Sequence, residues 1–243
     1  ANGVFFREET KPHIHDTVDP RAQPEAVPSA FSPNGDGRKD SFAVTHESSE
    51  EERWIATVSD DSGEEIAGRE WSGRAGTFSW DGRDRLGNVV EDGRYTYTVE
   101  ATDAAGNRTR ESLGPVRVDT AVVSAVVSFS GSGFSPNGDG YRDEIPLNLF
   151  ASPNREIAEW DLTIRDEAGN LIRRFGSETA SRVPGSISWD GNRASGALAA
   201  EGRYTAELEV EYLKGDLVRA STGAAALLDN SVPVVDLEAG PLP

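Results

Sequence analysis

The chain contains neither cysteine nor methionine among its 243 residues. The lack of cysteine excludes disulfide bonds, thiolate catalysis and cysteine-ligated metal sites, although it does not select a cellular compartment. Because methionine is missing even at position 1, and no signal peptide is visible, we expect a processed chain or a segment of a longer one. No apolar run approaches the roughly 18 residues that a spanning helix requires, so no membrane span is expected.

Basic residues are also scarce, with 24 Lys and Arg against 42 Asp and Glu and a formal net charge of -18. A field of this sign repels a phosphate backbone, which argues against a nucleic-acid partner. The acidity is compatible with a well-solvated surface, with cation binding, or with repulsion between neighbouring chains.

The chain is rich in residues that interrupt regular structure, with 25 glycines and 13 prolines spread along its length. Tyrosine, tryptophan, valine and threonine cluster between them in short alternating runs, which indicates many short strands. The composition therefore predicts an all-β protein.

The sequence repeats itself. The heptapeptide FSPNGDG occurs at residues 31–37 and again at 134–140, and an 18-residue segment at 79–96 matches 188–205 without a gap, with 9 identities. The shift between the copies grows from 103 to 109 residues, so the second copy carries short loop insertions. Residues 1–17 align with 104–120, so we expect them to be the last strand of a preceding unit. That strand should pair with the edge of the first unit or with another molecule.

These alignments predict two tandem immunoglobulin-like or fibronectin-III-like β-sandwich domains. The predicted boundaries are 1–17 for the terminal strand, 18–120 for the first repeat, 121–231 for the second repeat and 232–243 for a linker toward a following unit. The expected strands are 26–31, 41–47, 53–59, 64–70, 76–80, 94–102 and 109–118, then 127–134, 144–150, 158–166, 170–175, 185–189, 203–213 and 217–228. Residues 17–26 and 120–128 are expected to be linkers, the first stiffened by proline.

The repeated FSPNGDG loop is the sharpest candidate for chemistry. Counted from Ser32, oxygen-bearing side chains stand at positions 1, 3, 5 and 9 and a glycine stands at position 6, which is the spacing of calcium-binding loops. The candidate calcium ligands are Ser32, Asn34, Asp36 and Asp40 in the first copy and Ser135, Asn137, Asp139 and Asp143 in the second. The acidic ligand at position 12 of an EF-hand is missing, because Ala43 and Pro146 stand there. The alternative is a metal-free turn, in which these side chains accept hydrogen bonds from the nearby backbone.

A second repeated motif couples a Trp-Asp-Gly turn to a later tyrosine. It comprises Trp80, Asp81, Gly82 and Tyr95 in the first copy and Trp189, Asp190, Gly191 and Tyr204 in the second. Its aromatic rings could form a platform for a carbohydrate or another ligand. We favour a structural interpretation, with a buried tryptophan, an Asp-Gly turn and a tyrosine that opens the next strand.

Signals for catalysis are weak. The three histidines, His13, His15 and His46, do not recur in the second copy, and we interpret them as surface residues. The alternative for His13 and His15, which lie on one face of an expected strand, is a weak metal site. No nucleophile elbow, phosphate-binding loop or zinc-protease helix is present. The chain is therefore predicted not to be an enzyme.

Both motifs resemble known bacterial families. The loop from Ser32 to Asp40 resembles the signature of gliding-motility-associated C-terminal domains, and the segment from Trp80 to Val99 resembles the immunoglobulin-like domain of the flagellar hook-capping protein. In the second copy Ala206 and Leu208 replace a tyrosine and a valine of that pattern. Together the resemblances cover most of residues 17–229.

The resemblance implies an exported bacterial protein of the periplasm or cell surface, with repeats that act as non-catalytic spacers or assembly modules. The alternative is a calcium-stabilised adhesin or ligand-binding module. The implied partners are neighbouring repeats of the same polypeptide and, beyond them, envelope proteins or glycans.

Overall fold

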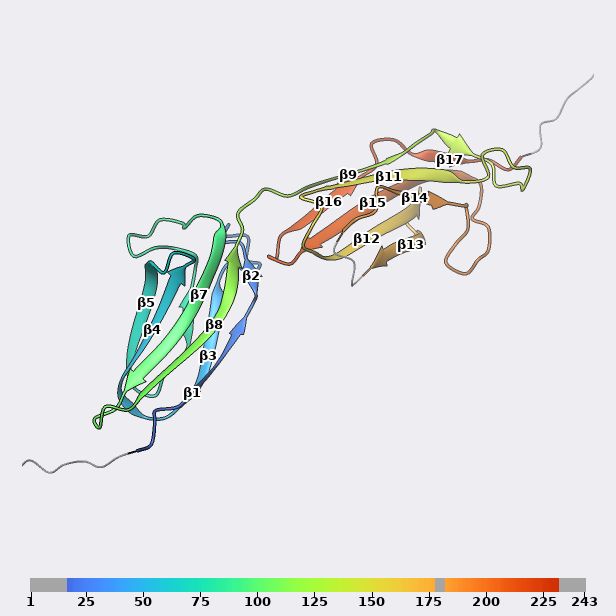
Figure 1. The fold of residues 1–243 in the computed structure, drawn as a ribbon. Coiled ribbons are helices and arrows are strands. Elements are labelled where there is room, and N and C mark those ends of the chain that lie inside the picture. Colours follow the sequence, from blue (N-terminus) through green and yellow to red (C-terminus); the bar gives the residue numbers. More distant parts are fainter. Residues whose placement is uncertain (1–16, 178–181, 232–243) are drawn as a thin grey trace, which may run out of the picture. The chain divides into compact units, whose positions relative to one another are not determined.

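The computed structural model describes residues 17–177 and 182–231, which separate into two compact units between Thr120 and Ala121 (Figure 1). All regular structure in these ranges is β-strand, and they contain no helix long and apolar enough to cross a membrane. The predictions for residues 1–16 and 232–243 lie outside the described ranges.

The first unit is a sandwich of two sheets (Figure 1). One sheet has the order β1-β3-β6 and consists of β1 (Ala22–Val27), β3 (Phe42–Ser48) and β6 (Phe78–Trp80). The other has the order β2-β8-β7-β4-β5 and consists of β2 (Ala30–Phe31), β8 (Arg108–Val118), β7 (Gly93–Thr102), β4 (Glu51–Asp60) and β5 (Glu65–Gly73). The ladders are antiparallel except for the parallel pair β2 and β8.

The second unit repeats this topology. Its small sheet has the order β14-β11-β9 and consists of β14 (Ser186–Trp189), β11 (Ile145–Ser152) and β9 (Ser124–Phe129). The larger sheet has the order β10-β17-β15-β12-β13 and consists of β10 (Gly133–Phe134), β17 (Ala226–Leu228), β15 (Gly202–Tyr212), β12 (Ile157–Asp166) and β13 (Leu171–Ser177), with β16 (Leu217–Ser221) also paired to β15.

Each unit has its own hydrophobic core, built from alternating residues of facing strands. In β11 the odd positions from Ile145 to Ala151 are buried while Pro146, Asn148 and Phe150 are exposed, which is the period of a strand with one face in the core. The tryptophans predicted to fill the cores do so, since Trp54 is fully buried and Trp160 is 7% exposed. The predicted fold class, tandem immunoglobulin-like sandwiches, is confirmed.

The predicted linkers were wrong at their C-terminal ends. Residues 22–27 and 124–129 form β1 and β9, each hydrogen-bonded to one neighbouring strand. Pro24 stands within β1 because an edge strand can turn a missing N–H toward solvent. The predicted strands 26–31 and 127–134 are correspondingly each split, because the chain leaves the small sheet and joins the larger one at β2 or β10.

The predicted strand 217–228 is also divided, into β16 and β17. Both pieces pair with β15, but Thr222 to Ala225 lie between them in a loop. The run of small residues in this loop gave no signal for the break.

Many of the acidic side chains build turns. In the turns that begin at Asp84 and Asp103, one carboxylate oxygen accepts backbone N–H groups two and four residues ahead at 2.8–2.9 Å. The side-chain amides of Asn88 and Asn107 donate to the other oxygen at 3.1 and 2.8 Å. These asparagine hydrogen bonds are the main reason why the pKa values of Asp84 and Asp103 are lowered. Part of the high negative charge therefore serves turn formation.

Candidate functional site

The FSPNGDG loop joins β2 to β3 in the first unit, and its aspartate carboxylates accept hydrogen bonds from the backbone of the same loop. Asp40 accepts the backbone N–H groups of Gly35 and Gly37, each at 2.8 Å. Asn34 Oδ1 accepts the N–H of Asp36 at 3.0 Å, and Asp36 Oδ1 accepts the N–H of Arg38 at 2.8 Å. Gly35 and Gly37 have φ values of +77° and +84°, a conformation that glycine adopts without a steric penalty.

The copy in the second unit has the same hydrogen bonds. Asp143 accepts the N–H groups of Gly138 and Gly140 at 2.8 Å each, and Asn137 Oδ1 accepts that of Asp139 at 2.9 Å. The structure thus brings together the Asn and Asp members of each predicted set. The two serines lie where the loop begins: Ser32 is buried, and Ser135 Oγ donates to the side chain of Asn230 at 3.4 Å.

The polar groups around the Asp40 carboxylate are N–H donors, whereas calcium is held by six to eight oxygen atoms. Across residues 17–177 and 182–231, no group of three or more His, Cys, Asp or Glu side chains is placed to hold a metal ion. This geometry favours the metal-free turn, and calcium binding stays a prediction for experiment.

The second motif is buried. Trp80 and Trp189 are 3% and 0% exposed, and their indole N–H groups donate to the carbonyl oxygens of Arg83 and Asn192 at 2.8 and 3.0 Å. Asp81 forms an ion pair with Arg83 at 3.6 Å, and Asp190 accepts the backbone N–H of Asn192 at 3.0 Å. A ligand platform needs exposed ring faces, so the burial favours the structural interpretation.

The two motifs, about 50 residues apart in the sequence, meet in the core. The Trp80 ring packs edge-on against Phe31 at 5.6 Å and against Tyr95 at 4.9 Å between ring centroids. Gly82 has a φ of +72° and lies so close to Pro33 that an added Cβ would be 3.0 Å from the proline ring. The first loop and the Trp-Asp-Gly turn therefore form one packed unit.

The same assembly recurs in the second unit. Trp189 packs against Phe134 at 5.2 Å and Tyr204 at 4.9 Å, and a Cβ on Gly191 would lie 2.9 Å from Pro136. Sequence reasoning had singled out the tryptophans and tyrosines but not Phe134 or Pro136. The signal for both residues was their recurrence within FSPNGDG, a motif whose oxygen atoms also match the spacing of a calcium loop.

A recurring carboxylate holds the second residue after the last strand of each unit. Asp92 Oδ1 accepts both the backbone N–H and the hydroxyl of Thr120, at 2.7 and 2.8 Å. In the second unit Glu201 accepts the backbone N–H of Asn230 at 3.1 Å. Asp92 and Glu201 each directly precede the glycine that opens β7 or β15, so this contact is a further shared feature that the sequence alignment did not reveal.

The first residues of each unit are also anchored. The Lys214 ammonium in the β15–β16 turn donates to the carbonyl oxygen of Ala121 and forms an ion pair with Asp216 at 3.0 Å. Lysine is rarely buried unless it is paired, and Lys214 is 4% exposed. In the first unit the hydroxyl of Thr109 donates to the carbonyl oxygen of Pro20.

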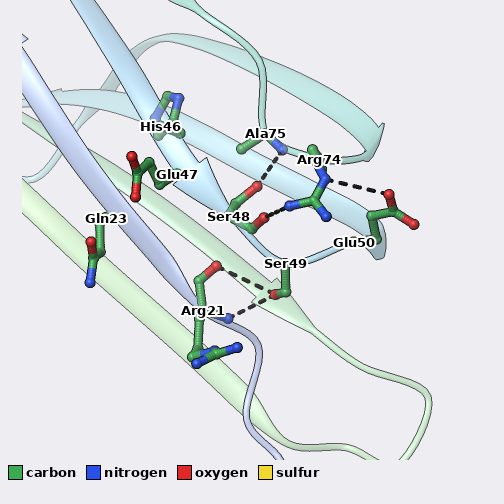
Figure 2. Close-up of a pocket in the computed structure, with 9 residues that line it drawn as sticks. All are labelled: Arg21, Gln23, His46, Glu47, Ser48, Ser49, Glu50, Arg74 and Ala75. Atoms are coloured by element: carbon green, nitrogen blue, oxygen red, sulfur yellow. Dashed lines mark hydrogen bonds and ion pairs between the residues drawn. The ribbon is translucent and has the colours of Figure 1, made fainter.

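One open depression of about 680 Å³ lies at the end of the first unit, lined by Arg21, Gln23, His46, Glu47, Ser48, Ser49, Glu50, Arg74 and Ala75 (Figure 2). The polar groups in its wall bond to one another. Arg74 contacts the Ser48 carbonyl and Glu50, and Ser49 exchanges hydrogen bonds with the backbone of Arg21 (Figure 2). Several polar groups in the wall of this depression are therefore already engaged by their neighbours.

His46 is not the surface residue that the sequence predicted. The side chain is half-buried, with Nδ1 2.7 Å from the Gly76 carbonyl oxygen and Nε2 2.6 Å from the Tyr97 hydroxyl. A carbonyl can only accept, so Nδ1 carries the hydrogen and Nε2 accepts from Tyr97. Burial is the main cause of the lowered pKa of His46 and of the raised pKa of Tyr97.

This polar pair is specific to the first unit. With the 103-residue shift between the copies, the position equivalent to His46 in the second unit is Leu149. In the alignment of the GRYT segments, the position equivalent to Tyr97 is Ala206. Two other residues of the depression, Gln23 and Glu47, correspond to the cross-strand pair of Val126 and Phe150. The depression is therefore not a feature shared by the repeats. His13 and His15 lie outside the described residues.

A family model described as the FlgD Ig-like domain matches residues 30–105 and 142–214, one segment in each unit. The chain belongs to the FlgD Ig-like domain family. Both segments contain the Trp-Asp-Gly turn and the tyrosine that packs on it. The expected relation to the hook-capping Ig-like domain is confirmed. No curated protein sequence is significantly similar to the chain.

This FlgD Ig-like chain is also similar to several solved structures at low sequence identity. A tetra-tandem repeat from the extending region of a large adhesion protein is 20% identical, with 86% of this chain and 50% of that chain covered and a TM-score of 0.37. The chain thus spans half the length of that structure. The fibronectin(III)-like modules of Clostridium thermocellum CbhA are 12% identical, with coverages of 86% and 94% and a TM-score of 0.41. A 1.5-MDa bacterial ice-binding adhesin is 12% identical, with coverages of 89% and 67% and a TM-score of 0.40.

The contact between the motifs predicts a specific cost for filling Gly82. Gly82→Ala should destabilise the first unit by about 1–3 kcal/mol more than Gly87→Ala, because of overpacking against Pro33. Gly87 is the matched control, since it has a similar positive φ of +86° but open space around a Cβ. Urea unfolding of the two variants measures the difference, and equal losses would contradict a tight contact.

The His46 pair predicts a pH dependence of stability. Folding lowers the pKa of His46, so the unfolded chain binds more protons than the folded chain just below pH 6.5. The free energy of unfolding should therefore decrease as the pH is lowered through this range. The slope should stay below about 1.4 kcal/mol per pH unit. His46→Gln should reduce the slope while His13 and His15 remain. Denaturant unfolding between neutral and mildly acidic pH tests this, and an unchanged slope in His46→Gln would refute it.

The loop geometry predicts that calcium leaves thermal stability unchanged. A ligand that binds only the folded state raises the melting temperature, so bound calcium would be visible as a shift that a chelator reverses. The measurement compares melting curves in calcium and in chelator. A shift that disappears in the Asp40→Asn and Asp143→Asn double variant would support the calcium interpretation instead.

Proposed function

We propose that this chain is a non-catalytic structural spacer within an exported bacterial multi-domain protein of the periplasm or cell surface. The observation that carries the proposal is the anchoring of both ends of each unit. Membership of the FlgD Ig-like family and the internal use of the repeated motifs support it.

A spacer needs connections that transmit position from one unit to the next. Thr120 and Ala121, the residues on either side of the division, are each hydrogen-bonded within their own unit, to Asp92 and to Lys214. Each of these bonds fixes a terminal residue to its own unit. The equivalent contact of Asn230 with Glu201 supports the same design at the end of the second unit.

The side chains of the recurring motifs bond or pack within their own unit. Trp80 and Trp189 are buried, and the loop carboxylates of Asp40 and Asp143 accept backbone N–H groups of their own loops. A binding or catalytic role would require these groups to be free toward a ligand. A structural role requires only what the contacts already supply.

Spin labels test the spacer proposal, and the cysteine-free chain allows two labels without background sites. Leu86→Cys and Glu167→Cys place one label on an exposed turn of each unit. Pulsed electron resonance should give one narrow distance distribution. Asp92→Ala should broaden it because Thr120 is released.

The matched control is Glu91→Ala, which removes a neighbouring charge while the hydrogen bonds of Asp92 remain. This variant should keep the narrow distribution, with circular dichroism showing that all variants are folded. A distribution that is already broad in the parent chain, or equal broadening in both variants, would overturn the proposal.

A further inference from the structure

The FSPNGDG loop carries a chemical liability in both copies, namely an asparagine followed by glycine. In such a pair the glycine amide nitrogen can attack the asparagine Cγ, forming the N–Cγ bond of a succinimide while the side-chain nitrogen leaves as ammonia. Water then opens the ring to aspartate or isoaspartate. The net reaction consumes one water and releases one ammonia, and it needs no other reactant.

The loop cannot easily avoid this pair. Gly35 and Gly138 have φ values of +77° and +82°, which other residues rarely adopt, and Asn34 and Asn137 each accept a backbone N–H that shapes the turn. Both residues of each pair are solvent-exposed, so water is not excluded. Any protection must come from hydrogen bonding rather than from burial.

The attacking nitrogen is held by a carboxylate. The Gly35 N–H donates to Asp40 Oδ1 and the Gly138 N–H to Asp143 Oδ1, each at 2.8 Å. The negative charge disfavours loss of the amide proton, which must leave before the nitrogen can attack, and the bond directs that N–H toward the carboxylate.

The electrophile is fixed as well. Asn34 Oδ1 accepts the N–H of Asp36 at 3.0 Å, and its copy Asn137 Oδ1 accepts that of Asp139 at 2.9 Å. Rotation of Cγ toward the following nitrogen would break this bond. Each loop therefore restrains both reacting atoms.

We propose that Asn34 and Asn137 are latent deamidation sites, and that Asp40 and Asp143 protect them by binding the N–H of the following glycine. The aspartate three residues after each FSPNGDG heptapeptide thus has the role of slowing deamidation of the loop asparagine. A carboxylate is needed there because an amide side chain lacks both the charge and the second acceptor oxygen.

Each repeat is the internal control for the other. In Asp40→Asn, deamidation at Asn34 should accelerate at least roughly tenfold relative to Asn137 in the same molecule, the scale of losing one charge-assisted hydrogen bond. Asp143→Asn should reverse the pattern. Peptide mapping by mass spectrometry after incubation at neutral pH measures each site, and it resolves the chain's third Asn-Gly pair, Asn2-Gly3, separately.

Asp61→Asn is the matched charge control, because Asp61 is an exposed turn residue outside the loop. It should leave both rates unchanged. Circular dichroism and hydrogen exchange of the core strands establish that unit one stays folded in Asp40→Asn. If that variant unfolds, Asp143→Asn and the second loop decide the matter.

Two results would overturn the proposal. One is an unchanged rate at Asn34 in folded Asp40→Asn, or at Asn137 in folded Asp143→Asn. The other is deamidation of the parent loops as fast as that of an unstructured peptide of the same sequence.

Discussion

Each unit depends on one tryptophan packed between a phenylalanine and a tyrosine that come from distant parts of its sequence. Phe31 ends the short strand β2, Trp80 ends β6, and Tyr95 is the third residue of β7, so the three rings join segments of both sheets. The glycine turn after the tryptophan fits against Pro33 only because it lacks a side chain. Truncating any of these rings would leave a void between the first loop and the later turn.

Once this packing is made, the polar groups around it are satisfied locally. The indole nitrogens bond to carbonyl oxygens of their own turns, and the loop aspartates bond to loop amides. Part of the high content of acidic residues has a structural role, since Asp84, Asp92 and Asp103 each accept hydrogen bonds from backbone N–H groups. The negative charge is thus built into the architecture of turns and ends.

Much of the fold could be predicted because period-2 patterns and internal repeats are local signals. The strand breaks in 26–31 and 127–134 escaped prediction, because a strand that changes sheets keeps its alternation. The break in 217–228 lies within one sheet, since β16 and β17 both pair with β15, and its small residues gave no turn signal. His46 was misjudged for a similar reason. Its partners, Gly76 and Tyr97, come from other segments, and no spacing rule connects residues 46, 76 and 97.

The candidate site shows the same limit. The oxygen spacing in Ser32 to Asp40 is equally compatible with a cation and with backbone amides, and only the direction of the Gly35 and Gly37 N–H groups favours one of them. The role of Asp92 was invisible because its acceptor bond spans 28 residues.

The parallel pairing of β2 with β8, and of β10 with β17, has a mechanical consequence. The chain reaches the first strand of each pair from the short edge strand β1 or β9, and it leaves after the end of the second. A pulling force along the chain therefore acts along these two strands in opposite directions. It loads their hydrogen bonds in shear, so that they resist together, whereas an antiparallel terminal pair would be peeled apart one bond at a time.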